Sequence, residues 1–548
     1  MAEQGAQIGV DPLRQNLIDV GKGRFQVTQE AYDVVEKETF DVFADGRQPG
    51  EWGHWTGRGM TWNTMCAACH NTGLTKGYSP ATDRFDTRRA EQGVGCEACH
   101  GMGSRHVADS SAPMAKPDMD TCGTCHSRRA ALTEDFLPGD AYLDHYAPSL
   151  PDLTEVYWAD GQVQDEDFEY VSFLSSRMYE AGVTCGDCHD AHSGGLKRQG
   201  DALCLECHET QESFQVHDHH AGDVQCVSCH MPVTVYMQRD PRHDHGFSSP
   251  DPALTASLGI PNACDRCHED TAPPPWAEPE NRPQRSRTLA LDRARRGDPS
   301  GLLTQAQSDP SPFWRAVAAG GLAPWAADPE VSSVLGALAE HPDPWVRYAA
   351  AGSHLEPVAL DDELRAVRVQ SQRAIMGQRR PTDRGMKDLR AYLELSRDQP
   401  SSAVELGNWW LISGSPAAGI AEIRRAIALD PGSAVHRAAL ARALAQLGRV
   451  EEAAKELRRA ISQHPDDADL HYLLALALSD LGQLDGSVSM LERVVTLDPN
   501  RARAWFNLGL ARQRQRDLAG AAQALRQALI LDPENREAAR ALAALKGP

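Results

Sequence analysis

Seven copies of one pentapeptide, Cys-x-x-Cys-His, constrain this 548-residue chain more than any other feature. All 14 cysteines fall inside these copies, which we number as motifs 1 to 7 in chain order. The cysteine pairs are Cys66 and Cys69, Cys96 and Cys99, Cys122 and Cys125, Cys185 and Cys188, Cys204 and Cys207, Cys226 and Cys229, and Cys264 and Cys267. The histidines that follow them are His70, His100, His126, His189, His208, His230 and His268.

The spacing within each motif suits covalent attachment of haem. Two thiols three positions apart on a helical turn can add to the two vinyl groups of one haem, and the next histidine then ligates the iron. A zinc ribbon needs no histidine after each second cysteine. A site with four cysteines also uses two pairs, so seven pairs would leave one pair without a zinc ion. A disulfide framework would not confine every cysteine to one pattern. The sequence therefore predicts seven covalently bound haem c groups.

Nine further histidines accompany the motifs within residues 1–270, whereas the remaining 278 residues contain five histidines. This surplus predicts that most irons have a histidine on both faces, and such irons pass electrons without binding substrate. His106 and His192 follow their own motifs so closely that we expect each to ligate the iron of a neighbouring motif. The candidate second ligands are His54, His106, His145, His192, His217, His219, His220, His243 and His245. Met178, Met231 and Met237 are weaker candidates, because methionine more often serves as packing.

Negative charge is confined to the part that contains the motifs. Residues 1–270 hold 20 Lys and Arg against 43 Asp and Glu, whereas residues 271–390 hold 16 against 15 and residues 391–548 hold 19 against 19. The whole chain has a formal charge of −22, the wrong sign for a surface that binds nucleic acid. An acidic surface favours a redox partner that is cationic where it makes contact.

A proline cluster follows the last motif, with five prolines between Thr271 and Pro283. This composition cannot propagate a helix and predicts a stiff connector. We therefore predict a multihaem cytochrome c domain at residues 1–270, a linker with a first helix at 271–300, HEAT-like hairpins at 301–395 and tetratricopeptide repeats at 396–548. The first domain is expected to have little regular secondary structure and to be packed around haem, and the rest to form an α-solenoid, so the fold class is mainly α.

A 34-residue period marks the last part of the chain. Pro431, Pro465, Pro499 and Pro533 share this spacing, and so do Gly414, Gly448 and Gly482, with Arg516 at the fourth glycine position. Two helices with a glycine turn between them and a proline after the second are typical of tetratricopeptide repeats. We predict four repeats, a terminal capping helix over residues 537–546 and a concave surface that binds a protein partner.

A second, shorter repeat lies upstream. Pro312, Arg315 and Ala318 recur 32 residues later as Pro344, Arg347 and Ala350, which favours two HEAT-type helical hairpins. The tryptophans of the helical parts are expected to pack in hydrophobic cores rather than to bind a ligand. They are Trp314, Trp345, Trp409 and Trp410.

Several runs of residues resemble a bacterial family of multihaem c-type cytochromes with C-terminal tetratricopeptide repeats, loosely akin to the cytochrome c554 and octahaem group. The runs include Trp55-Thr56-Gly57-Arg58, Trp62-Asn63, Cys96 to Gly101 with Ser104-Arg105-His106, Gly182 to Asp190, Cys226 to Pro232, and Pro261 to Cys264. The resemblance implies electron transfer and attachment of haem in the periplasm or another extracytoplasmic space. Family members usually carry a signal peptide and another motif module before a segment similar to residues 8–13. We therefore expect an N-terminally shortened chain or a misplaced start, either of which would account for a surplus histidine that serves an eighth haem.

Electron transfer is the preferred function, with the solenoid docking a partner protein. The alternative is a haem-dependent oxidoreductase that acts on a small nitrogen or sulfur species at one open iron, with Tyr142, Tyr146 or Tyr179 as an accessory residue. No motif ends in lysine, as the active haem of the similar nitrite reductases does, and no catalytic residue is assigned. A protein whose haems are merely structural or sensory ranks third. No phosphate loop, Rossmann fingerprint or catalytic triad stands out, and no apolar stretch is long enough to span a membrane.

Overall fold

The computed structural model describes residues 6–153, 156–165, 168–208, 224–268, 283–354, 359–376 and 383–545. The chain forms two compact units. The first consists of Met1–Arg47 and Gly59–Leu395, and the second of Gln48–Arg58 and Ser396–Pro548. No helix within the described ranges is both long and apolar enough to cross a bilayer.

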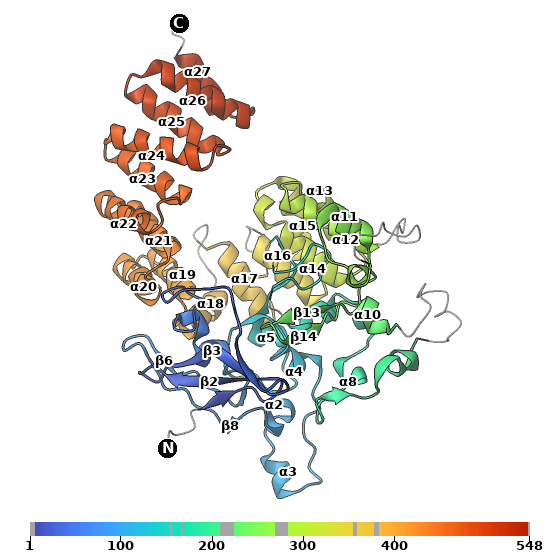
Figure 1. Ribbon diagram of the computed structural model, residues 1–548. Helices are drawn as coiled ribbons and strands as arrows, with labels where there is room; N and C mark the ends of the chain where they lie inside the picture. Colours follow the sequence, from blue (N-terminus) through green and yellow to red (C-terminus); the bar gives the residue numbers. More distant parts are fainter. Residues whose placement is uncertain are drawn as a thin grey trace. The chain divides into compact units, whose positions relative to one another are not determined.

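The first unit begins with a four-stranded antiparallel sheet in the order β1-β2-β3-β4 (Figure 1). Its strands are β1 (Gln7–Ile8), β2 (Leu13–Asp19), β3 (Phe25–Asp33) and β4 (Glu38–Asp41). Alternating side chains on β3 turn Val27 and Ala31 inward, as the two-residue period of a strand requires. Val27 packs with Trp62 and Ala67, which lie at the start of motif 1. The sheet therefore supports the first motif.

The described residues in the rest of the motif-bearing region, up to residue 268, form short elements. The helices are η1 (Arg58–Met60), α1 (Trp62–Met65), α2 (Cys96–His100), α3 (Ser104–Ala108), α4 (Met119–Gly123), α5 (Tyr142–His145), α6 (Glu169–Leu174), α7 (Arg177–Glu180), α8 (Cys185–Cys188), η2 (Gly200–Ala202), η3 (Cys204–Glu206), α10 (Cys226–His230), α11 (Pro252–Leu258) and η4 (Ala263–Arg266). Five two-stranded ribbons pair β5 (Asn71–Thr72) with β8 (Glu91–Gln92), β6 (Tyr78–Ser79) with β7 (Arg84–Phe85), β9 (Arg129–Ala131) with β10 (Tyr146–Pro148), β11 (His189–Asp190) with β12 (Gly195–Leu196), and β13 (Val233–Tyr236) with β14 (Asp240–His243).

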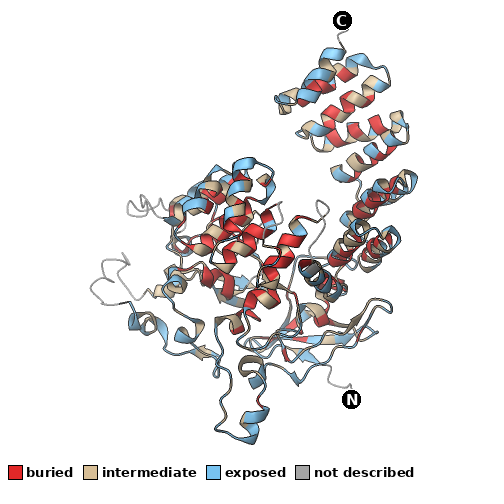
Figure 2. Ribbon diagram, turned by 180° about the vertical axis from the view of Figure 1, so that it is seen from behind, coloured by how far each residue is buried: buried red, intermediate tan, exposed pale blue. Residues whose placement is uncertain are grey.

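Buried side chains are unevenly distributed (Figure 2). They are dense in the long helices, whereas the segments around α2, α3 and α8 are largely exposed or half-buried. Helices of four or five residues cannot bury enough apolar surface to stabilise themselves. The motif-bearing region therefore depends on something other than its own side chains to fill its interior.

Seven longer helices complete the first unit. They are α12 (Pro283–Arg295), α13 (Ser300–Ser308), α14 (Pro312–Gly321), α15 (Pro329–Leu338), α16 (Pro344–Ser353), α17 (Arg365–Ala374) and α18 (Asp383–Leu395), with the short η6 (Ala323–Trp325) after α14. Proline occupies the first position of α14 and α16, where its missing N–H costs nothing, which explains the 32-residue repeat. Trp314 and Trp345 are buried, as expected for core residues.

These helices pack directly on the motif-bearing region. Trp345 stacks on Tyr142, with ring centroids 5.9 Å apart, and lies 6.2 Å from the ring of Tyr170. The Arg295 guanidinium donates a hydrogen bond of 2.7 Å to the carbonyl of Tyr157. The Tyr348 hydroxyl donates one of 3.0 Å to the carbonyl of Pro148. The helical layer thus holds the short elements that carry the motifs.

The second unit contains four helix pairs and a terminal helix. The pairs are α19 (Pro400–Ile412) with α20 (Pro416–Leu429), α21 (Ala434–Gln446) with α22 (Val450–Gln463), α23 (Ala468–Asp480) with α24 (Leu484–Leu497), and α25 (Ala502–Arg514) with α26 (Leu518–Leu531), followed by α27 (Arg536–Ala544). Each of the four repeated prolines lies two residues beyond the second helix of its pair. Trp409 and Trp410 are half-buried and contact each other edge-on, with centroids 4.6 Å apart.

The prediction of a mainly α chain ending in an α-solenoid is confirmed, but the four-stranded sheet was not expected. The HEAT-like hairpins share a compact unit with the motifs, and residues 48–58 belong with the repeats. Pro283, assigned to the linker, instead begins α12. Residues 271–282 and Lys546 lie outside the described residues, and the predicted domain limits stay predictions.

The fourth turn between paired helices places Arg516 where the other repeats have glycine. Arg516 has φ +67°, close to Gly482 at +72°. Side chains disfavour this left-handed region, so Arg516→Gly is expected to stabilise the α25–α26 hairpin by about 0.5–1 kcal/mol. Hydrogen–deuterium exchange of peptides from this hairpin measures the change as slower exchange. Gly482→Ala is the matched control and should accelerate exchange in α23–α24; unchanged exchange in both variants would contradict the assignment.

Candidate haem-binding site

Each motif folds into a helical turn that brings its two cysteines to one side. Motifs 2 and 6 form α2 and α10. In four other motifs the backbone N–H of the histidine donates to the carbonyl of the first cysteine: His70 to Cys66 (3.2 Å), His126 to Cys122 (2.9 Å), His208 to Cys204 (3.0 Å) and His268 to Cys264 (2.9 Å). Positions i and i+3 of a helical turn are neighbours on its surface. None of the 14 cysteines is in a disulfide, and all are exposed or half-buried.

Polar residues just before several motifs fix where the turn begins. The Asp118 carboxylate accepts from the Thr121 backbone N–H at the start of α4, and Asn262 accepts from the Cys264 N–H at 2.8 Å. Such caps satisfy backbone donors that a helix start leaves unpaired. The Asp201 carboxylate accepts from the Cys226 N–H in the same way, although it lies far from motif 6 in sequence.

Motif 1 is tied to the N-terminal sheet by a buried asparagine. The Asn63 side chain accepts from the Phe25 backbone N–H at 2.9 Å and donates to the Gly23 carbonyl at 3.1 Å and the Thr87 hydroxyl at 2.8 Å. Asn63 is 1% exposed, so all its hydrogen bonds come from protein. The Trp62-Asn63 pair is conspicuous in the sequence, and the structure gives it this anchoring role.

The imidazole rings of several motif histidines are oriented by their Nδ1 atoms. His100 Nδ1 donates to the carbonyl of Ala115 at 2.8 Å, and His230 Nδ1 donates to that of Ser248 at 2.9 Å. A proton held on Nδ1 leaves the Nε2 lone pair available to a metal. This donor set, two thiols and an oriented imidazole, fits covalently bound haem.

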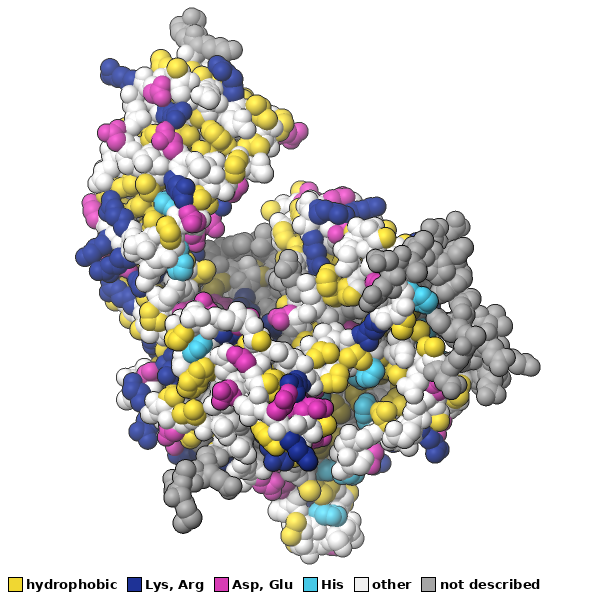
Figure 3. Space-filling model, in the orientation of Figure 1, with side chains coloured by type: hydrophobic (Ala, Val, Ile, Leu, Met, Phe, Trp, Pro, Cys, Tyr) yellow, Lys and Arg dark blue, Asp and Glu magenta, His cyan; other side chains and the backbone are white. Residues whose placement is uncertain are grey.

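Three of the additional histidines show the same arrangement. His106 Nδ1 donates to the Ala112 carbonyl, His243 Nδ1 to the Met231 carbonyl and His245 Nδ1 to the His243 carbonyl, each at 2.8 Å. Histidine side chains are visible on the surface of the motif-bearing region (Figure 3). These rings therefore present Nε2 as the motif histidines do.

Two of the additional histidines face a motif histidine. The rings of His100 and His192 have centroids 5.9 Å apart and planes within 17° of parallel. Those of His189 and His245 are 6.2 Å apart at 30°. A metal–imidazole bond is about 2 Å long and the centroid lies about 1 Å beyond the nitrogen, so rings on opposite sides of one iron have centroids about 6 Å apart. Both separations fit one iron between two histidines.

The motifs lie next to one another in a definite order. Burial and the nearby Cys122 and Cys125 raise the pKa of the Cys99 thiol, which links motif 2 to motif 3. The Cys69 thiol lies 3.8 Å from the Cys125 carbonyl, and Cys185 lies close enough to raise the pKa of the Cys122 thiol, so motif 3 also borders motifs 1 and 4.

The later motifs continue this order as a single series. Cys188 of motif 4 interacts electrostatically with Cys204 of motif 5, Cys204 with Cys226 of motif 6, and Cys229 of motif 6 with Cys264 of motif 7. Motifs 3 to 7 thus follow one another in space, and motifs 1 and 2 both join the series at motif 3.

His126 of motif 3 differs from His100 and His230 because its Nδ1 donates to a carboxylate. The Nδ1–Oε2 distance to Glu169 is 3.3 Å. This hydrogen bond raises the pKa of His126 despite the opposing effect of burial. Burial favours the neutral carboxyl group, but the hydrogen bond from His126 lowers the pKa of Glu169. Sequence reasoning missed Glu169, which is one of 43 acidic residues in this region.

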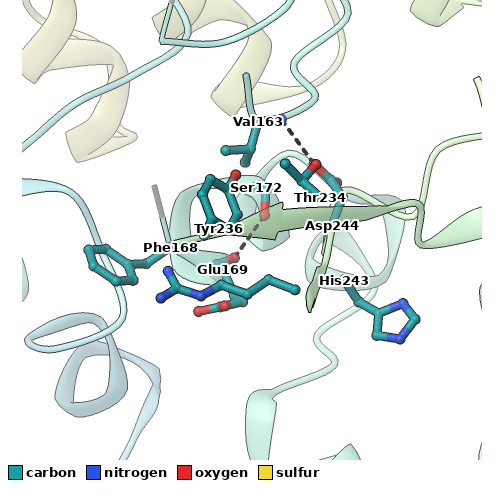
Figure 4. A pocket seen from close by; sticks show the side chains of 9 residues that line it. Val163, Phe168, Glu169, Ser172, Thr234, Tyr236, His243 and Asp244 are labelled. Carbon is teal, nitrogen blue, oxygen red and sulfur yellow. Dashed lines mark hydrogen bonds between the residues drawn. The ribbon is translucent and has the colours of Figure 1, made fainter. Parts of the chain in front are cut away.

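Glu169 also lines a small, partly open pocket of about 20 Å³, together with Val163, Phe168, Ser172, Thr234, Tyr236, Arg242, His243 and Asp244 (Figure 4). This volume has room for little more than a water molecule. Figure 4 shows His243 pointing away from Phe168 and Glu169. Burial raises the pKa of Asp244, which accepts from the backbone N–H of Val163 at 3.1 Å.

His145 is unlike the other candidate ligands, because both its ring nitrogens face protein groups. Its Nδ1 lies 2.6 Å from the Thr133 hydroxyl and 3.4 Å from the Asp135 carboxylate. Its Nε2 lies 3.3 Å from Asp140. The ring is buried against the edge of Phe136. This arrangement fits a structural histidine better than an iron ligand.

The remaining candidates lie in varied surroundings. His54 is buried in the second unit with Nδ1 2.7 Å from the Thr56 hydroxyl. His217, His219 and His220 lie outside the described residues. Met231 contributes its carbonyl to His243, and Met178 and Met237 stay predictions as weak candidates.

The tyrosines considered for catalysis are engaged with protein. Tyr142 is 1% exposed and shares a hydrogen bond of 2.6 Å with Ser127. Tyr146 lies under the Arg129 guanidinium, which is 3.9 Å from its ring centroid, and burial raises the pKa of Tyr146 to about 12. Burial also raises the pKa of Tyr179. Within the described ranges, no cluster of three or more His, Cys, Asp and Glu could hold a separate metal ion.

The motif turns and oriented imidazoles define a protein that binds haem c covalently, joined to a helical-repeat region. Family models agree with both halves. "Cytochrome c554 and c-prime" matches residues 53–101, and "Doubled CXXCH motif" matches residues 179–213. "Tetratricopeptide repeat" matches residues 411–477 and 472–536. The chain is a multihaem c-type cytochrome with C-terminal tetratricopeptide repeats.

Individual relatives match parts of the chain. The C-type polyheme cytochrome OmcB of Geobacter sulfurreducens is 23% identical over 176 residues, which are 31% of this chain and 20% of that protein. The dissimilatory sulfite reductase MccA of Wolinella succinogenes is 26% identical over 166 residues, 26% of this chain and 22% of that protein. The chain thus spans about a fifth of the length of the curated relatives it matches.

Solved structures are similar to part of the chain. MamA is 22% identical with a TM-score of 0.25, covering 28% of this chain and 94% of that chain. YrrB, described as a TPR protein with an unusual peptide-binding site, is 21% identical with a TM-score of 0.25, covering 29% of this chain and 82% of that chain.

Replacing His145 tests its structural role. His145→Gln removes the ring packing on Phe136 and the contacts of the buried ring with Thr133, Asp135 and Asp140, and is expected to destabilise the first unit by about 0.5–1.5 kcal/mol. The urea midpoint of unfolding, followed by haem absorbance, should fall while the low-spin haem spectrum stays unchanged. His464→Gln, after α22, is the control and should change neither. A new high-spin haem in His145→Gln would show that His145 is an iron ligand.

Proposed function

We propose that this chain carries electrons through seven covalently attached haem groups, and that its tetratricopeptide repeats bind a protein partner. The observation that carries the proposal is the pairing of His192 with His100 and of His245 with His189 at separations of 5.9 and 6.2 Å. An iron held between two imidazoles is coordinatively full and exchanges electrons without binding substrate. Haem c supplies the one-electron chemistry, and the chain sets its ligands and spacing.

The order of the motifs supports electron transfer through the whole motif-bearing region. Motifs 3 to 7 form a continuous series, and motifs 1 and 2 adjoin motif 3. All seven motifs have the same residue types and form a similar turn, which supports a full complement of seven haem groups. The acidic residues of residues 1–270 favour a redox partner with a cationic contact surface.

The remaining histidines extend this proposal. His106 and His243 present Nε2 as His245 does, so we assign them as further axial ligands. Attachment of haem to paired thiols fits a periplasmic or other extracytoplasmic location. We assign His145 a structural role instead.

A second candidate function rests on the match to MccA, which is named as a sulfite reductase. In that case one haem keeps an open face and reduces a small sulfur or nitrogen species. Tyr142 is hydrogen-bonded to Ser127, and Tyr146 packs under Arg129. Neither of these two tyrosines therefore supports an open catalytic haem.

Low-temperature EPR of the oxidised, haem-loaded chain separates the two functions. We expect every iron to be low-spin and unchanged by sulfite, nitrite or hydroxylamine, with total haem quantified as pyridine haemochrome. His192→Ala should convert one haem of the seven to a high-spin form, because His100 then lacks its facing ring. His464→Ala is the matched control, since it removes a histidine from the second unit. One high-spin, ligand-sensitive iron in the unaltered chain would favour the enzyme instead.

A further inference from the structure

The acceptor of the Nδ1 proton differs between motif 3 and two other motifs. His100 and His230 donate to the neutral backbone carbonyls of Ala115 and Ser248. His126 donates to the Glu169 carboxylate at 3.3 Å. The same ring position therefore meets a full negative charge in motif 3 and a dipole in motifs 2 and 6.

The position of Glu169 is fixed by the residue that follows it. The Tyr170 backbone N–H donates to the His126 carbonyl at 2.9 Å, and its hydroxyl donates to Asp120 at 2.9 Å. The Tyr170 ring is buried and covers Gly123, where a Cβ would lie 2.9 Å from it. These contacts lock α6 against α4, so the carboxylate is held beside His126 by the packing of two helices.

Neighbouring charges do not duplicate this arrangement. Arg242 lies 5.3 Å from the Phe168 ring centroid in the same pocket and pairs with Asp240 at 2.8 Å. Asp244 is buried and accepts from backbone N–H groups of Val163 and Gly246.

A carboxylate acceptor changes the electronic character of a ligating imidazole. It draws the Nδ1 proton towards itself and makes Nε2 a stronger donor to a bound metal. A stronger donor stabilises ferric over ferrous iron and lowers the reduction potential, which protein groups around haem are known to tune. The reaction concerned takes up one electron from a neighbouring haem or the redox partner, and the Nδ1 proton stays shared between His126 and Glu169.

Motif 3 is also the point where the series of motifs branches. Cys125 adjoins Cys69 of motif 1, and Cys122 adjoins Cys185 of motif 4. Cys99 of motif 2 lies close to both cysteines of motif 3. A change of potential here therefore affects exchange with three neighbouring haem sites at once.

We propose that Glu169 is a positioning residue that, through its hydrogen bond to His126, sets the reduction potential of the motif 3 haem below those of the motif 2 and motif 6 haems. The inference rests on the proposed electron-transfer function. It makes the branching haem the one that stays oxidised while electrons occupy motifs 2 and 6.

The test is a potentiometric titration of the full haem-loaded chain followed by EPR and absorbance. Glu169→Gln keeps a hydrogen-bond acceptor and removes the charge. It should shift the reduction equilibrium of one haem at least tenfold towards the ferrous form, which is about 59 mV for one electron, and change the EPR signal of that haem. Glu180, at the end of α7, is exposed. Glu180→Gln is therefore the matched control and should leave the reduction potential of that haem unchanged. A shift shared by both variants, or absent from both, would overturn the proposal.

A second pair of variants tests the proposal even if the Glu169→Gln variant does not fold. The double variant C122S/C125S lacks the motif 3 haem, and C96S/C99S lacks the motif 2 haem. The component missing from the first should lie at least tenfold, about 59 mV, below the component missing from the second. Equal potentials, or the reverse order, would refute the role of Glu169. Fewer than seven reversibly reducible haems in the unaltered chain would instead contradict the proposed function.

Discussion

The hydrogen bond from a histidine Nδ1 to a fixed protein acceptor is the interaction on which this site depends. A cysteine pair can attach a haem, but the imidazole must point its Nε2 at the iron, and the partner of Nδ1 decides its direction. Ala115 and Ser248 supply that partner to His100 and His230. Because these acceptors are backbone atoms, the orientation is built into the path of the chain rather than into side-chain identity.

The scaffold explains how so many short turns hold their places. The described helices of the motif-bearing region have three to seven residues, and its buried side chains are few compared with those of the long helices (Figure 2). Trp345 packs on Tyr142 and Tyr170, and Arg295 reaches the carbonyl of Tyr157. Large apolar porphyrin faces would complete this interior, as bound metals complete small domains that do not fold without them. The helical layer therefore holds the motifs from one side, and the haem groups would fill the interior between them.

Much of this organisation could be predicted from the sequence because it is local or periodic. The cysteine spacing predicts the motif turns, and the 34-residue period predicts the four helix pairs, including the one in which Arg516 replaces glycine. The four-stranded sheet was missed although β2 and β3 span seven and nine residues, because polar residues such as Gln15 and Gln26 stand at buried positions and obscure the apolar alternation. The hydrogen bond from the Phe25 N–H to Asn63, which ties the sheet to motif 1, joins distant segments and was likewise not predicted.

The candidate ligands show the same limit. Counting histidines yields nine candidates but cannot separate His145, whose two nitrogens face Asp135 and Asp140, from His192, which faces His100. Glu169 is missed because nothing near it in sequence marks it; its role comes from the packing of Tyr170 between α4 and α6. Which distant residues pair depends on the fold and cannot be predicted from the spacing of residues in the sequence.

An experimental density map of the haem-loaded chain tests the central claim most directly. The account predicts seven haem groups, with the motif 3 haem in contact with the haems of motifs 1, 2 and 4 and the others following in series to motif 7. It also predicts His192 and His245 on the irons of motifs 2 and 4. A map in which the motif 3 haem lies at one end of the series, or in which those two irons have other ligands, would contradict it.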